Sequence, residues 1–132
     1  MAFAISDPAV VINNEPVTLA PGSVVYTEGL GEQNIRAQSS GNGSVDQVYS
    51  DDVTTHFSMV KFAVYNVIDS IELMRTLKRN RNANVVTVSG VDPTTGSKIT
   101  RTFNKAALLN DYEVAFGSDT TIELDFKSLP AV

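Results

Sequence analysis

Along most of this chain, hydrophobic residues alternate with polar ones, and this period of two predicts β-strands with one buried face. Residues 121–128 are the clearest case, because Ile122, Leu124 and Phe126 alternate with polar side chains. Other short runs predict strands at 8–13, 16–20, 23–28, 34–38, 84–90, 99–103 and 112–116. The pattern favours a mainly-β domain, in which a turn at 91–98 joins two of these runs as a hairpin.

The segment 53–65 has apolar side chains on both faces of its predicted strand. Phe57 and Met59 would lie on one face, and Val60 and Phe62 on the other. A strand of this composition is expected to be covered on both sides. At ~3.3 Å per residue it would extend for about 40 Å. That length is large for a domain of this size, so we expect its first residues to project from the body.

A single helix is predicted at residues 69–80. Ile71, Met74 and Leu77 form an apolar stripe at helical spacing, and Asp69 or Ser70 would cap its first turn. Its last turn is basic, through Arg75, Lys78, Arg79 and Arg81. Either these cations simply complement the helix dipole and face solvent, or they form a docking face for an acidic partner. Residues 104–111 are expected to form one helical turn or a short connector.

Residues 39–52 are polar and rich in glycine, serine and aspartate. They precede the most regular predicted strand, yet they carry no motif with an evident chemical role. A segment of this composition costs little to leave disordered before it binds. We therefore interpret it as a flexible arm, at about 39–52, that reaches another copy of the same protein. The chain from 1 to 132 is expected to be a single domain.

Charge is distributed unevenly along the chain, whose net charge is −5. Residues 1–60 carry a net charge of −6, residues 61–105 of +5, and residues 106–132 of −4. This division is either ordinary solvated charge or a self-complementary surface, in which acidic parts of one copy face basic parts of the next. The overall acidity argues against nucleic-acid binding, which needs a basic surface.

Composition narrows the class of protein further. The chain has no cysteine, which excludes disulfides and thiolate metal sites and fits a reducing compartment. Its apolar runs are far shorter than the roughly 20 residues of a membrane helix, so no membrane segment is expected. The first ten residues lack a basic region followed by an apolar one, so no signal peptide is expected either.

Candidate catalytic groups are few. His56 is the sole histidine, and a catalytic triad would have to combine it with Asp51 or Asp52. A histidine among strand threonines is more often a surface or interface residue. Glu123 and Asp125 could form an acid–base pair, but their spacing fits the wet face of the last strand better. The glycines at 41–44 match no nucleotide-binding loop. We expect no enzyme activity, no metal and no cofactor.

Three stretches together resemble the tail tube proteins of bacteriophages with contractile tails. They are 35–65, where a glycine-rich loop leads into a long strand; 79–90, where a basic helix end leads into a hairpin; and 100–132, which closes on "GSDTTIELDF" and a proline. The resemblance implies a β-sandwich or small barrel with one flanking α-helix and an extended loop or hairpin arm. It implies a structural virion protein whose rings, usually of six copies, stack into a hollow tube that delivers DNA.

The same resemblance implies partners, a location and site residues. Related tubes serve in R-type bacteriocins and type VI secretion. The partners would be further copies and the sheath, tape-measure, baseplate and terminator proteins, assembled in the host bacterial cytoplasm into a virion tail. DNA would pass through the lumen without specific binding. The expected subunit interface comprises Ser40, Asn42, Ser44, Val45, Val48, Tyr49 and Thr54. Acids near the lumen would be Asp46, Asp51 and Asp52, and the sheath-facing basic cluster would be Arg75, Lys78, Arg79 and Arg81.

An alternative function remains open at this stage. A small β-rich decoration or binding module, on a virion or a pilus, would share the polar loops and the lack of catalytic residues. Self-polymerisation separates the two alternatives, since a tube subunit polymerises and a decoration module does not.

Overall fold

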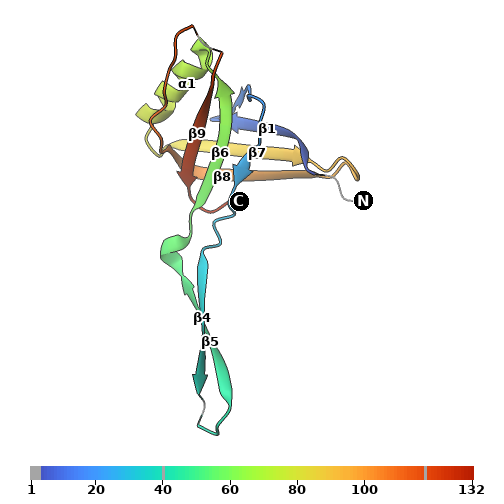
Figure 1. Ribbon diagram of the computed structural model, residues 1–132, viewed down its shortest axis with the longest axis vertical. Coiled ribbons are helices and arrows are strands. Elements are labelled where there is room, and N and C mark those ends of the chain that lie inside the picture. The colour runs from blue at the N-terminus through green and yellow to red at the C-terminus, as the bar shows by residue number, and fades with distance from the viewer. Residues whose placement is uncertain (1–3, 40, 118) are drawn as a thin grey trace.

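The protein is mainly β, and its described residues form one α-helix and two sheets (Figure 1). The structure is a computed structural model that describes residues 4–39, 41–117 and 119–132. In chain order the elements are β1 Ser6–Ile12, β2 Glu15–Val17, β3 Val25–Tyr26, β4 Glu32–Ser39, β5 Val45–Asp52, the 3-10 turn η1 Val53–Thr55, β6 Ser58–Tyr65, α1 Ile68–Arg79, β7 Asn84–Val91, β8 Lys98–Leu108 and β9 Thr121–Ser128. The sequence-based expectation of a β-rich fold with one flanking helix is confirmed.

Seven strands form one sheet in the order β2-β1-β7-β8-β9-β6-β3. β6 and β9 are antiparallel along their full length, from Ser58 opposite Ser128 to Tyr65 opposite Thr121. Their alternate side chains are buried, as the period of two predicts, and the rings of Phe62 and Phe126 stack with centroids 5.7 Å apart. The buried faces of these strands therefore supply much of the core.

β8 joins two crossed parts of this sheet. Its first part pairs with β7, and its last residues, Ala107 and Leu108, pair with β9. The β7–β8 register shifts between Asn84 and Val86, and Lys105 has a positive φ of 52°. Such a bulge bends a strand. In Figure 1, β6 and β9 accordingly run across the direction of β1, β7 and β8.

The helix prediction is confirmed, with a different start. α1 buries Met74 and Leu77 against the core. Its N-cap is Val67, whose side chain makes no capping hydrogen bond, so the expected cap at Asp69 or Ser70 is wrong. Burial of the apolar stripe, rather than a cap, therefore positions this helix.

Three other segments differ from what the sequence predicted. The strand expected at 53–65 begins only at Ser58, because 53–55 form a 3-10 turn. Its second face is only partly covered, since Met59 and Ala63 are half-buried whereas Lys61 and Tyr65 are exposed. Residues 104–111 were expected to form a helical turn or a short connector, but 104–108 continue β8 and bury Ala106 and Leu108. Residues 112–116 form no strand.

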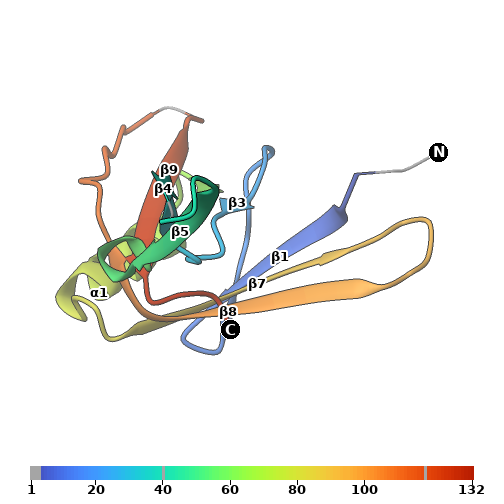
Figure 2. The same cartoon turned by 90° about the horizontal axis from the view of Figure 1, so that it is seen from below.

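β4 and β5 form a separate two-stranded sheet that projects from the body as a hairpin (Figure 1). Their antiparallel register runs from Glu32 opposite Asp52 to Ser39 opposite Val45. We call this hairpin, residues 32–52, the arm. The hairpin form of the arm is one of the two forms that the sequence led us to expect. The arm starts at residue 32, before the residues 39–52 that the sequence assigned to it. Figure 2 views the arm from its distal end.

Candidate assembly surfaces

The two faces of the arm differ in chemistry. Side chains of residues paired across an antiparallel ladder lie on the same face. Ile35 pairs with Tyr49, and Ser39 pairs with Val45, so these residues share one face with Ala37. Ile35 is 56% exposed, Val45 72% and Tyr49 58%. We call the apolar residues of this face, Ile35, Ala37, Val45 and Tyr49, the apolar arm face; the polar side chains on the same side of the hairpin are those of Gln33, Ser39, Gln47 and Asp51.

The opposite face of the arm is mostly polar. Its described side chains include Arg36, Gln38, Asp46 and Ser50, and the single apolar residue among them is the half-buried Val48. An isolated two-stranded hairpin is at best marginally stable in water. Exposed apolar surface that is bounded by polar residues marks an interaction site in many proteins. The arm is therefore a candidate contact surface.

The expected interface residues do not form one surface. Val45 and Tyr49 lie on the apolar arm face, whereas Val48 lies on the opposite one. Asn42 and Ser44 form the turn, where Ser44 Oγ donates to Asn42 Oδ1 at 2.7 Å. Thr54 belongs to η1 at the base of the arm, and Ser40 lies outside the described residues.

Ile35 and Ala37 are missing from the sequence-based set of interface residues. The alternation of residues 34–38 was correctly interpreted as a strand, but as a separate one. Only the register with β5 shows that Ile35 and Ala37 share a face with Tyr49. The pattern of a single strand does not reveal this pairing, so the sequence carried no signal that would add Ile35 and Ala37 to the interface set.

The acids expected near a lumen are likewise separated. Asp46 pairs with Gln38 near the tip, on the polar face of the arm. Asp51 lies at the base on the other face, where its carboxylate accepts a hydrogen bond from His56 Nε2 at 2.9 Å. The backbone of Asp52 pairs with Glu32, and its side chain lies outside the described part of the structure. Asp46 and Asp51 thus do not form a common acidic patch.

The basic end of α1 is divided between a structural residue and surface residues. Lys78 Nζ donates to the backbone carbonyls of Leu108 at 3.0 Å and Leu109 at 3.5 Å, which attaches the helix to the end of β8. Arg75, Arg79 and Arg81 are exposed. The three arginines are therefore available to a partner, whereas Lys78 contributes to the fold.

The outer face of β6 and β9 carries balanced charges. Lys61 Nζ lies 3.9 Å from Asp125 Oδ1 across the two strands. Lys127 Nζ lies 4.0 Å from the centre of the Phe57 ring. Glu123 on this face is exposed, as expected for the wet face of the last strand. This surface can contact water or a neighbouring molecule, but it offers no enclosed acid–base pair.

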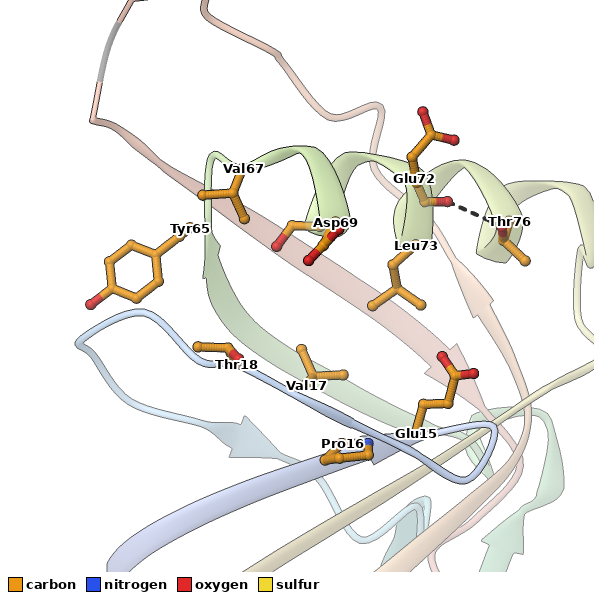
Figure 3. A pocket seen from close by; sticks show the side chains of 11 residues that line it. Glu15, Pro16, Val17, Thr18, Tyr65, Val67, Asp69, Glu72, Leu73 and Thr76 are labelled. Atoms are coloured by element: carbon orange, nitrogen blue, oxygen red, sulfur yellow. Dashed lines mark hydrogen bonds between the residues drawn. The ribbon is translucent and has the colours of Figure 1, made fainter.

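A groove of about 770 Å³ lies between β2 and the first turns of α1 (Figure 3). Val17 and Leu73 are among its apolar lining residues, and the side chains of Glu15 and Asp69 point into the gap. Glu72 also lines it, but its carboxylate points away from the gap in Figure 3. Since these three are its only charged lining residues, the groove is acidic.

Two ionisable groups have shifted pKa values, and both have structural causes. Burial raises the pKa of the Tyr26 phenol, and the neighbouring Glu28 carboxylate adds to the effect. The backbone N–H of Thr94 donates to Asp92 Oδ1 at 2.9 Å and holds the pKa of that carboxyl below its usual value. Within the described residues, no group of three or more acidic or histidine side chains is placed to hold a metal ion.

The fold is shared with structural parts of contractile injection systems. The terminating cap of the anti-feeding prophage tube superposes with a TM-score of 0.62 at 9% sequence identity, over 100% of this chain and 91% of that chain. The sheath/tube terminator of an extracellular contractile injection system, PVC, gives 0.58 at 10% identity, over 100% and 96%. The sheath–tube complex of PVC gives 0.56 at 11% identity, over 95% and 86%.

Sequence comparison adds no relative to this set. No family profile matches the chain, and no curated protein sequence matches it. The likeness therefore concerns the fold, and it extends over almost the whole of both chains. No helix in the described part of the chain is long and apolar enough to cross a membrane.

Proposed function

We propose that this protein is a structural subunit of a contractile tail or injection system, whose copies stack as rings into a hollow tube. The observation that carries the proposal is the apolar arm face, which projects from a body whose fold is shared with tube-associated proteins. Because the arm extends away from the body, its face is completed by another copy of the chain.

The contact made by the arm is heterologous, since the arm of one copy docks on a different surface of the next. Heterologous contacts generate closed rings when the rotation closes and open polymers when it does not. Six copies per ring is the expected number, and a similar fold occurs in the anti-feeding prophage baseplate, which was solved with six-fold symmetry. DNA would pass through the lumen of such a tube without specific binding, past acids that include Asp46, Asp51 and Asp52.

The proposed partners are those of a tail. Sheath, tape-measure, baseplate and terminator proteins would contact different surfaces of the assembled rings, within a virion tail assembled in the host bacterial cytoplasm. The exposed arginines at the end of α1, with Lys78 beside them, are the proposed sheath contact. A structural role requires no catalytic group.

A second candidate function is that of a terminator or cap that closes a tube made by another protein. The observation that favours it is that two of the solved structures with this fold are a tube cap and a sheath/tube terminator. Their TM-scores of 0.62 and 0.58 are close to the 0.56 of the sheath–tube complex, so the fold alone does not separate the two roles. A decoration module is the third possibility.

Negative-stain electron microscopy of the concentrated protein tests the proposal. A tube subunit forms hollow tubes or stacked rings, either alone or when purified baseplates are added as initiators. A cap forms single rings that bind to the ends of tubes and do not extend them. Particles that remain monomeric with and without baseplates would contradict both roles and favour the decoration module.

A further inference from the structure

Three chain segments meet where the arm joins the body. They are residues 29–31 leading into β4, Asp51 at the end of β5, and η1 with His56 leading into β6. We propose that His56 is a positioning residue that fixes the direction of the arm relative to the body. We call this arrangement the lock. Its purpose in assembly rests on the proposed function, whereas the experiment below tests the lock without reference to assembly.

His56 lies between Asp51 of β5 and Gly31, the residue that precedes β4. Its Nε2 donates a hydrogen bond to Asp51 Oδ1 at 2.9 Å, which holds the end of β5. Its ring lies directly against the backbone of Gly31, just before β4. A Cβ at Gly31 would lie 2.8 Å from His56 Nε2 and 2.9 Å from Thr55 Oγ1, so only glycine leaves room for the ring. The φ of Gly31 is +76°, which also favours glycine.

A second connection reinforces the first. The backbone N–H of Glu32, the first residue of β4, donates to Thr55 Oγ1 at 2.6 Å. The N–H of Phe57 donates to the carbonyl of Thr55 at 2.9 Å. The strand entering the arm and the turn leaving it are therefore bonded to each other. In a simple hinge, no hydrogen bond would connect these two chain segments.

The junction is fixed to the body on its other side. The N–H of Ala131 donates to the carbonyl of Glu28 at 3.0 Å. At Gly29 an added Cβ would lie 2.8 Å from the Cα of Pro130 and 2.7 Å from Ser58 Oγ, which shows how closely the chain packs there. The arm is thus connected through residues 29–31 to a part of the chain that the body holds firmly.

The consequence concerns the cost of assembly. An arm that swings freely must lose that freedom when it docks, and this loss weakens association. An arm whose direction is set beforehand avoids most of it. The sequence led us to expect a flexible arm that becomes ordered on contact. The bonded junction instead indicates an arm that is oriented before contact.

Distance measurement between two spin labels tests the lock in the full chain. The protein has no cysteine, so the substitutions Gln38→Cys in the arm and Glu72→Cys on α1 create unique attachment sites. Both positions are exposed. Diluting labelled protein into an excess of unlabelled protein keeps the measured distances within one molecule. We expect a single narrow distance distribution in the otherwise unchanged protein.

His56→Ala should broaden this distribution to about twice its width, because the arm then samples several directions. Asp51→Ala removes the same hydrogen bond from the other side and should have the same effect. His56→Gln should restore the narrow distribution, since its amide N–H can still donate to Asp51. Asp46→Ala, on the arm but away from the junction, is the matched control and should change nothing. Thermal denaturation confirms that each variant is folded.

A broad distribution in the unchanged protein would overturn the lock, and so would an unchanged distribution in both His56→Ala and Asp51→Ala. Neither result depends on polymerisation. A protein that shows the lock but never forms rings, tubes or caps would refute the proposed function and leave the lock standing.

Discussion

At the scale of single residues, Asn84 shows how a polar side chain organises this core. It is fully buried, and its Nδ2 donates to the backbone carbonyls of Leu77 at the end of α1 and Ala106 in β8, each at 3.1 Å. Its Oδ1 accepts from Asn13 and Asn80, each at 3.2 Å. One side chain thus connects a helix end to several separate backbone segments.

We expect Asn84→Ala to lower the free energy of unfolding by about 2–3 kcal/mol, because buried carbonyls lose their donor. Urea denaturation followed by circular dichroism measures this change. Asn82→Ala, at an exposed asparagine nearby, is the matched control and should change the free energy by less than about 0.5 kcal/mol. An equal effect of the two substitutions would mean that the Asn84 network contributes little.

Asp92 provides a prediction about pH. Its folded-state pKa is lowered, chiefly by the N–H of Thr94, so its contribution to stability is complete above the unfolded pKa of about 3.9. This contribution is lost as the pH falls through the lowered folded-state pKa. The difference in melting temperature between the parent and Asp92→Ala should therefore be largest near neutral pH and shrink below about pH 4. A difference in melting temperature that grows in acid would contradict a stabilising effect of ionised Asp92.

At the scale of elements, the sequence predicted the strands and the helix best where a single buried face repeats. β9 and α1 follow from periodicity alone, because each buries one stripe of side chains. Residues 104–111 were expected to form a helical turn or a connector, and the continuation of β8 to Leu108 was missed, since a bulged strand has no clean period of two. The second face of β6 was expected to be covered because its composition is apolar in part, but Lys61 and Tyr65 on that face are exposed.

The arm shows that sequence-based prediction of the candidate site is limited in the same way. The sequence indicated a segment that reaches outward, and a hairpin does project there. Composition suggested flexibility because residues 39–52 are rich in glycine, serine and aspartate. It did not show that residues 32–39 pair with 45–52, nor that this pairing places Ile35 beside Tyr49. Cross-strand register depends on both strands at once, so it could not be read from either one.

The apolar arm face gives a prediction at this scale. The double substitution Ile35→Ser with Tyr49→Ser should abolish self-association and leave the melting temperature of the body unchanged, since neither residue belongs to the core cluster. Electron microscopy and analytical ultracentrifugation measure the two effects. Gln38→Ser with Ser50→Ala, on the opposite face, is the matched control and should assemble normally. Normal assembly of the first variant would exclude this face as the contact.

The basic end of α1 gives another prediction. Reversing Arg75, Arg79 and Arg81 to glutamate should leave tube formation intact and abolish binding of the sheath, because the sheath contact is proposed to be acidic. Co-sedimentation of preformed tubes with purified sheath protein measures this binding. If the variant instead fails to form tubes, these arginines face another subunit. If both properties are unchanged, they only complement the helix dipole.

At the scale of the whole molecule, the division of charge and the arm suggest two different kinds of contact. The arm offers apolar surface, which salt does not weaken. The acidic and basic parts of the chain would attract each other between neighbouring copies, and this attraction is screened when the Debye length falls from about 30 Å at 0.01 M salt to about 3 Å at 1 M. Ionic strength therefore separates the two contributions.

We expect self-association, followed by sedimentation velocity, to weaken steeply as sodium chloride rises from about 0.01 M to about 1 M. Sucrose, which adds no ions, should not weaken it. The arm-face variant should lose association at every salt concentration, because its apolar contact is missing throughout. Association that stays constant or strengthens with salt would mean that apolar contacts dominate, and that the uneven charge of this chain is ordinary solvated surface.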